Sequence, residues 1–127
     1  WDGYPVERTA LLNSLAAVRN PVVLTGDYHA AMVLDVHEEP FNQDSPVIAP
    51  EFMAPPISSS LFDADVSART PQLRQQLNVH GYLTVEVTPD LLTTRIRTVD
   101  DVSDPDTGIT TAATWQVDAG NPVAQEV

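Results

Sequence analysis

The stretch VHGYLTVEVTPDLLTTRIRTV, residues 79–99, carries the strongest secondary-structure signal in the chain. From Gly81 to Val87, apolar and polar residues alternate, which places the apolar side chains on one face of an extended strand and the polar ones on the other. The tripeptide TPD then turns the chain, and LLTTRIRTV returns with residues typical of a strand. The sequence therefore predicts an antiparallel hairpin at this point.

Several further elements are predicted on the N-terminal side of this hairpin. Pro71 to Leu77 is expected to form one short helix. Val47 to Met53 is predicted to be a strand, and a weak one, because Pro50 has no N–H to donate to a ladder. Ala30 to Val36 is predicted to be another strand. Val22 to Thr25 is a short apolar strand of the kind that is covered on both faces.

A helix is predicted at the N-terminal end of the chain, from Pro5 to about Val18. Proline suits the first helical position, and an acidic side chain in the first turn favours the positive end of the helix. Leu11, Leu15 and Val18 fall on one face of this helix. The dipeptide Asn20-Pro21 is expected to end it, because a residue before proline avoids the helical region.

The predicted element order is one helix followed by five or six mostly antiparallel strands, which defines an α+β fold. Thr110 to Val117 is the last expected strand, so residues 1–117 form the ordered part and residues 118–127 a disordered tail. The same elements equally suit one half of a larger layered sandwich. The early covered strand, Val22 to Thr25, favours the half-sandwich, because such a strand needs neighbours on both sides.

The composition limits the class of partner. The 127 residues suffice for one domain with its own core, and no apolar run approaches the roughly 20 residues of a membrane helix. Eighteen acidic residues against six basic ones give a net charge of −12, so we expect neither nucleic acid nor membrane as a partner. Cysteine is absent, which excludes a disulfide framework and a thiolate metal site.

The segment NPVVLTGDYHA, residues 20–30, places Asp27 and His29 directly after a predicted strand. Side chains at i and i+2 of an extended chain point the same way, and sites are often built at strand ends. A carboxylate oxygen and an imidazole nitrogen together suit zinc, iron, manganese and similar ions. The alternative is that Asp27 caps a turn and that His29 is a surface residue.

Two other groups of residues were candidates for a site. The opening motif WDGYP contains Asp2 and Tyr4 just before a helix start, where either residue faces a site or Asp2 satisfies backbone donors of the helix. His37, with the acidic residues around it, is a rival metal cluster, although such charge runs usually form a solvated loop. Because the chain opens on Trp1 within a dense motif, we expect it to be a piece of a longer protein.

Several motifs, in order, resemble the end of the PhoD-like phosphatases. The matching segments, from Trp1 to about Val102, are WDGYPVER, NPVVLTGDYHAA, PEFMAPPISS, HGYLTVEVTPD and RTVDDV. The most specific pair is WDGYP followed by GDYH at residues 26–29, where the family usually has GDVH. Tyr28 is therefore a departure, and PEFMAPPISSS also diverges from the usual pattern.

The resemblance implies the C-terminal portion of a calcineurin-like metallophosphatase, a sandwich of two facing β-sheets with helices outside. It implies a phosphate ester substrate, phosphomonoesterase and phosphodiesterase activity, iron and calcium as metals, and export from the cytoplasm. By position, Asp27 and His29 match the family's last metal-binding motif, and Asp2 and Tyr4 match a motif near the site.

The remaining metal ligands of the family lie in earlier motifs, which would belong to a missing N-terminal part of the same protein. We therefore expect this chain to be inactive by itself, to hold at most a weakly bound ion and to self-associate through its uncovered sheet. The alternative is a non-catalytic extracellular α+β module with a binding or structural role.

Overall fold

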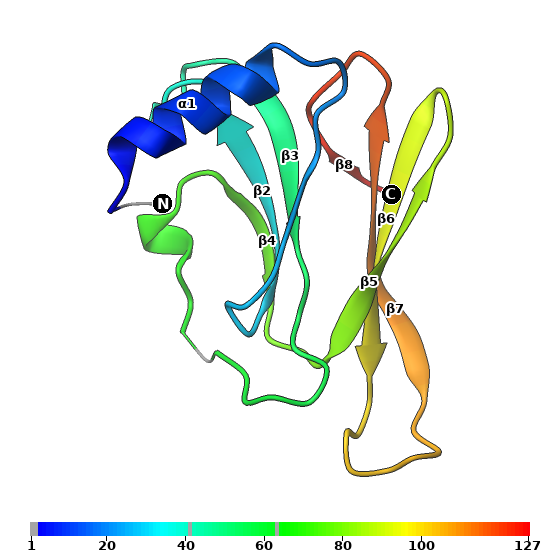
Figure 1. Ribbon diagram of the computed structural model, residues 1–127. Helices are drawn as coiled ribbons and strands as arrows, with labels where there is room; N and C mark the ends of the chain where they lie inside the picture. Colours follow the sequence, from blue (N-terminus) through cyan, green and yellow to red (C-terminus); the bar gives the residue numbers. More distant parts are fainter. Residues whose placement is uncertain (1–2, 41, 63) are drawn as a thin grey trace.

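Two four-stranded sheets and one helix make up the computed structural model, which describes residues 3–40, 42–62 and 64–127 (Figure 1). The α+β class is confirmed, but the described residues form eight strands rather than five or six. The elements of the described residues are α1 (Pro5–Ala16), β1 (Val23–Thr25), β2 (Ala31–His37), β3 (Val47–Met53), the 3-10 turn η1 (Ser67–Arg69), β4 (Leu73–Leu77), β5 (Gly81–Val87), β6 (Leu91–Val99), β7 (Ile109–Asp118) and β8 (Gln125–Glu126).

The first sheet has the order β1–β3–β2–β4, with β1 parallel to β3 and the other pairs antiparallel. Strand β3 was expected to be weak, yet it is central. Pro50 lies opposite Asp35, whose own N–H donates to the Gln72 carbonyl at 2.9 Å, on the β4 side. Strand alternation therefore directs the Pro50 nitrogen away from β2, and pairing with β1 begins only at Glu51. The missing N–H costs the ladder little at this position.

Helix α1 covers the face of the first sheet that points away from the second sheet (Figure 1). It ends at Ala16, two residues before the expected end at Val18. The expected apolar face is only partly correct, because Leu12 is the buried residue of the helix while Leu11 is 40% exposed. Along the described part of the chain, no helix has the length and apolar character that crossing a membrane requires.

Strand β4 corrects the helix expected from Pro71 to Leu77. The leucine, arginine and glutamine residues of this segment favour helices in isolation, but tertiary context overrides such weak preferences. Here, Leu73 to Leu77 pairs with β2 at the edge of the first sheet, and the short helical turn lies earlier, at Ser67–Arg69. The ladder supplies backbone partners that a helix this short lacks.

The second sheet has the order β5–β6–β7–β8 and contains the predicted hairpin. Strands β5 and β6 pair in register from Gly81 opposite Thr98 to Val87 opposite Leu92. The hairpin turn is closed by Thr88, whose N–H donates to the Leu91 carbonyl at 2.9 Å. The final strand expected from Thr110 to Val117 is present as β7.

Residues 118–127, expected to be a disordered tail, instead fold back onto the second sheet. Strand β8 pairs with β7, and the Val127 N–H donates to the Thr114 carbonyl at 3.0 Å. Ala124 is fully buried, and the Gly120 N–H donates to Asn20 Oδ1 at 2.7 Å. The segment is ordered because its few apolar side chains close the end of the core, a contact that composition alone does not predict.

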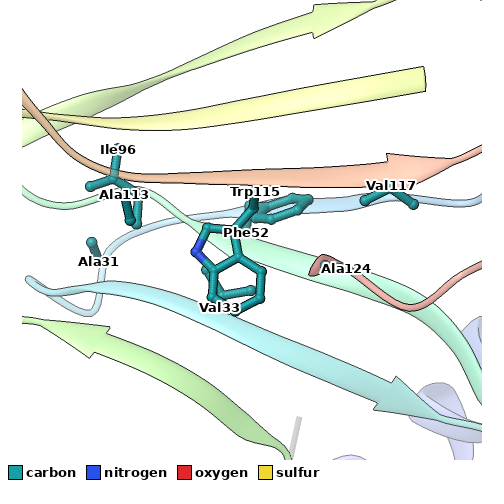
Figure 2. Packing of buried hydrophobic residues seen from close by; sticks show 8 residues of the cluster. All are labelled: Ala31, Val33, Phe52, Ile96, Ala113, Trp115, Val117 and Ala124. Atoms are coloured by element: carbon teal, nitrogen blue, oxygen red, sulfur yellow. The ribbon is translucent and has the colours of Figure 1, made fainter. Parts of the chain in front are cut away.

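The hydrophobic core lies between the two sheets. Figure 2 shows Trp115 next to Val33 and Phe52 at its centre, and the cluster comprises Ala31, Val33, Phe52, Ile96, Ala113, Trp115, Val117 and Ala124. Trp115 is 3% exposed, and its indole N–H donates to Gln75 Oε1 at 3.1 Å. Burial of the ring together with a satisfied N–H is the usual way a core accommodates tryptophan.

Thr94 gives a first prediction about stability. It lies opposite Trp115 in the β6–β7 ladder and is fully buried, and its hydroxyl has no hydrogen-bond partner among the described residues. Thr94→Val replaces this hydroxyl with a methyl group of similar size, so it is expected to raise the free energy of unfolding by about 1 kcal/mol.

Urea unfolding measures the change. Thr84→Val, at an exposed position of β5, is the control and should change stability by less than about 0.5 kcal/mol. A Thr94→Val variant less stable than the wild type would show that the hydroxyl has a stabilising partner.

Candidate functional site

The candidate metal ligands lie in the loop that leaves β1. Strand β1 ends at Thr25, and Asp27 and His29 follow before β2 begins at Ala31. The carbonyl of Thr25 accepts a hydrogen bond of 2.9 Å from the Ala54 N–H, which fixes the end of β1 against the end of its parallel neighbour β3. The loop therefore begins at the carboxyl ends of two parallel strands, where α/β proteins commonly build sites.

The backbone of this loop is not extended. Asp27 has φ 72° and His29 has φ 63°, both in the left-handed region. The expectation that the two side chains share a side because of strand alternation therefore rested on a wrong premise, since alternation holds only for extended backbone. A left-handed conformation costs a non-glycine residue about 1–2 kcal/mol, although aspartate and histidine tolerate it better than most.

Two left-handed residues within three positions, Asp27 and His29, are an unusual backbone feature that indicates a functional loop. Such conformations persist only where the surroundings hold them, and they concentrate at active sites and ligand clamps. Here the holding contacts come from the segment after β3. The Phe62 N–H donates to the His29 carbonyl at 2.9 Å, and the rings of Tyr28 and Phe62 pack with centroids 4.7 Å apart. Ala30, which follows, is fully buried.

The side chains of the pair are accessible from outside the core. Asp27 is exposed and His29 is half-buried. Within residues 3–40, 42–62 and 64–127, no group of three or more histidine, cysteine, aspartate or glutamate side chains is placed to hold a metal ion. Asp27 and His29 are thus chemically suited to one side of a metal site, and further ligands would have to come from elsewhere.

The residues of the WDGYP motif are only partly described. Asp2 lies outside the described residues. Tyr4 is 66% exposed and precedes α1, where its carbonyl accepts a hydrogen bond of 2.9 Å from the Arg8 N–H. This backbone contact places Tyr4 at the start of the helix.

The other histidines have structural partners. His37 Nδ1 lies 2.8 Å from the Ser45 carbonyl, in a turn that buries Ser45. Nearby Asp35 pairs with Arg74 at 3.0 Å. His80 Nε2 lies 2.9 Å from the Ser59 carbonyl. His37 therefore stabilises its own turn, and Asp35 pairs with β4. These contacts support the interpretation that the cluster around His37 is structural and does not bind a metal.

The sequence does not predict two hollows of the described molecule, one of which reaches the start of this loop at Thr25. One of about 350 Å³ lies between α1 and the first sheet, and Leu12, Leu15 and Glu51 are among its lining residues. In this hollow, the Thr25 hydroxyl donates to Glu51 Oε1 at 2.6 Å. Another of about 360 Å³ is open and polar and lies along β4. Neither hollow is lined by Asp27 or His29, so the candidate site is assigned from the geometry of the loop and not from a cavity.

Comparisons with known proteins agree with the motifs. A family model described as PhoD-like phosphatase matches residues 1–96. Alkaline phosphatase D of Bacillus subtilis (strain 168) is 32% identical over 125 residues, a match that covers 91% of this chain and 21% of that protein. A solved structure described as "Structure of PhoD" superposes with a TM-score of 0.86 at 26% identity, covering 100% of this chain and 26% of that chain. The chain thus spans about a fifth to a quarter of the length of these relatives.

Proposed function

The chain belongs to the PhoD-like phosphatase family, and from this premise we propose that it supplies part of the metal site of a phosphomonoesterase or phosphodiesterase. The observation that carries the proposal is the left-handed pair Asp27 and His29, held at the carboxyl end of a parallel strand within the matched region. The rest of the site would come from other parts of the whole protein, whose complete architecture we take to be a calcineurin-like two-sheet sandwich.

The donor chemistry of the pair fits this role. A carboxylate oxygen and an imidazole nitrogen are ligands for iron, zinc or manganese, and carboxylate oxygen also suits calcium. By family resemblance, we propose iron and calcium as the metals of the whole enzyme. A metal ion bound in such a site supplies Lewis-acid stabilisation of the phosphoryl oxygens and lowers the pKa of water. Asp27 and His29 would orient it, from a loop whose start is fixed by the Ala54 N–H bond to the Thr25 carbonyl and whose end is fixed by the Phe62 N–H bond to the His29 carbonyl.

Two further features of the proposal rest on the family. The substrate would be a phosphate monoester or diester, and the whole protein would act outside the cytoplasm. The non-catalytic extracellular module is the alternative to an enzyme. The pair of left-handed residues favours the enzyme, because strained backbone conformations concentrate at active sites and ligand clamps, and here both strained residues carry metal-ligating side chains.

Hydrolysis assays test the proposal in two forms of the protein. The complete gene product is expected to hydrolyse p-nitrophenyl phosphate or bis(p-nitrophenyl) phosphate, to lose activity on chelation and to regain it when metal is restored. The 127-residue chain by itself is expected to show no turnover with added iron or calcium, since one pair of ligands does not position a metal for catalysis.

Metal-dependent turnover by the 127-residue chain above a heat-denatured control would show that its own residues complete the site. A complete gene product without metal-dependent hydrolysis of either ester would contradict the proposed function itself.

A further inference from the structure

The segment that follows β3, residues 54–62, runs past the loop that carries Asp27 and His29 and is called the bridging segment below (Figure 1). It contains two consecutive prolines, which have no N–H to donate, and it forms neither a helix nor a strand. Its middle part, Ile57 to Ser60, is exposed and gains little from burial. The path of the bridging segment therefore depends on hydrogen bonds to its neighbours.

The two ends of the bridging segment hold the two ends of the candidate loop. At its start, the Ala54 N–H donates to the Thr25 carbonyl at 2.9 Å. At its end, the Phe62 N–H donates to the His29 carbonyl, also at 2.9 Å. A displacement of Phe62 would therefore be passed directly to the backbone of His29.

The connection into β5 fixes the bridging segment between these ends. The Gly81 N–H donates to the Pro56 carbonyl at 3.0 Å, and His80 Nε2 lies 2.9 Å from the Ser59 carbonyl. Because a carbonyl oxygen only accepts, Nε2 is the donor of this second bond. His80 is held in turn, since its own carbonyl accepts from the Val99 N–H at 3.0 Å, at the end of β6. The imidazole thus links the exposed middle of the bridging segment to the second sheet.

We propose that His80 is a positioning residue for the metal-ligand loop. Its imidazole fixes the Ser59 carbonyl close in sequence to the Phe62 N–H, which contacts the left-handed residue His29. A left-handed conformation of this kind persists only where its surroundings hold it, so a loose bridging segment would let His29 relax. His80 would act through this backbone and not as a ligand. The inference rests on the proposed function, because it takes the loop to be part of a metal site.

Two amide substitutions at His80 form a matched pair. In His80→Gln, the side-chain nitrogen lies as many bonds from Cα as histidine Nε2 does, so it can still donate to the Ser59 carbonyl. His80→Asn carries the same amide on a shorter side chain, which does not reach that carbonyl. The two variants therefore differ in the presence of the hydrogen bond and share the loss of the imidazole.

Amide hydrogen exchange of the complete gene product, measured after chelation with residue-resolved mass spectrometry, is the first readout. The Phe62 amide is expected to exchange about tenfold faster in His80→Asn than in the wild type, and within about threefold of the wild type in His80→Gln. The Ala54 amide, which donates beside the β1–β3 pairing, is the internal control and should change little. This readout requires neither bound metal nor turnover.

Manganese(II) titration of the same proteins, followed by electron paramagnetic resonance of the free ion, is the second readout. Manganese serves as the probe because the carboxylate and imidazole of the loop both suit it. Its affinity is expected to be about tenfold weaker in His80→Asn and close to the wild type in His80→Gln. A residue that supports only the fold would leave the affinity of the folded protein unchanged.

Three results would overturn the inference. Equal Phe62 exchange in the wild type and His80→Asn would mean that the imidazole does not hold the bridging segment. Faster exchange with unchanged manganese affinity would mean that the bridging segment does not position the loop. Equal impairment of His80→Gln and His80→Asn would mean that the donated hydrogen bond is not the cause. A wild-type product that binds no manganese would contradict the proposed function, and the inference with it.

Discussion

Replacing Gly81 with alanine is expected to lower the free energy of unfolding by about 4 kcal/mol or more. A Cβ atom at this position would lie 1.9 Å from the carbonyl oxygen of Arg97 and 3.0 Å from the Cα of Thr98. Both are backbone atoms of the neighbouring strand, so no side-chain rotation relieves the overlap. Gly81 also has φ 155°, a conformation that side-chain-bearing residues rarely adopt.

The clash would propagate because of where Gly81 lies. It begins β5 opposite Thr98 of β6, and its N–H donates to the Pro56 carbonyl at 3.0 Å in the segment after β3. Moving β5 away from β6 would therefore strain the hairpin and also weaken a link between the two sheets. Since Leu83 of β5 packs against the core, part of the apolar contact would be lost as well.

Urea unfolding of the purified chain measures this effect. Gly26→Ala is the matched control, because a Cβ at Gly26 meets nothing within 4 Å and the substitution should change stability by less than about 0.5 kcal/mol. If Gly81→Ala were within about 1 kcal/mol of the wild type, the close approach of β5 to Arg97 would be refuted.

The contrast between the hairpin and the neighbouring elements shows what the sequence predicts well. The β5–β6 hairpin depends on the alternation of apolar and polar residues and on a turn that joins consecutive segments. The secondary structure of residues 81–99 can therefore be predicted without knowledge of the rest of the fold. Strand β4 depends on pairing with β2, almost forty residues earlier in the case of Arg74 and Asp35. Its local preference for helix was therefore misleading, and the distant partner decided the structure.

The C-terminal segment illustrates the same limit. Ala124 is fully buried because two sheets meet at that point, and neither its residue type nor its neighbours signal the contact. Pro50 is the converse case. Proline is usually confined to edge strands, yet Pro50 lies in a central strand. Whether its nitrogen points toward a neighbouring strand depends on the strand register, which the sequence alone does not determine.

The candidate site was predicted in location but not in conformation. The position of Asp27 and His29 after an apolar strand follows from the sequence, and the structure places them there. Their left-handed backbones do not follow from it, although aspartate and histidine are enriched at positive φ. The contact of Tyr28 with Phe62 was also unexpected, because it joins segments that the sequence shows only as loops.

Substitution of the pair itself is expected to have the largest effect on activity. In the complete gene product, Asp27→Asn or His29→Ala should lower kcat for the proposed phosphate ester hydrolysis by about 100-fold or more, together with metal content. The physical reason is the loss of a donor from an ion that the proposed chemistry requires. The measurements are steady-state turnover and elemental analysis of the same preparations.

The backbone of the loop requires matched variants, because alanine tolerates left-handed φ less well than histidine does. His29→Asn keeps a residue that adopts this conformation readily while removing the imidazole, and Asp27→Asn does the same for the carboxylate. Measured after chelation, these variants should have the unfolding midpoint of chelated wild type, and with metal present they should lose metal content and turnover. His37→Gln, which removes an imidazole that contacts the Ser45 carbonyl, is the control for the rival cluster and should stay active.

The combination of readouts separates a ligand from a structural residue. A residue that only shapes the loop would change the stability of the metal-free protein as well as activity, whereas a ligand changes metal content and leaves the stability of the metal-free protein unchanged. Near-normal turnover and metal content in the His29→Ala enzyme would refute the assignment. Asp27 would then be a turn residue and His29 a surface residue, and the strain of two left-handed positions would need a cause in the Phe62 contact alone.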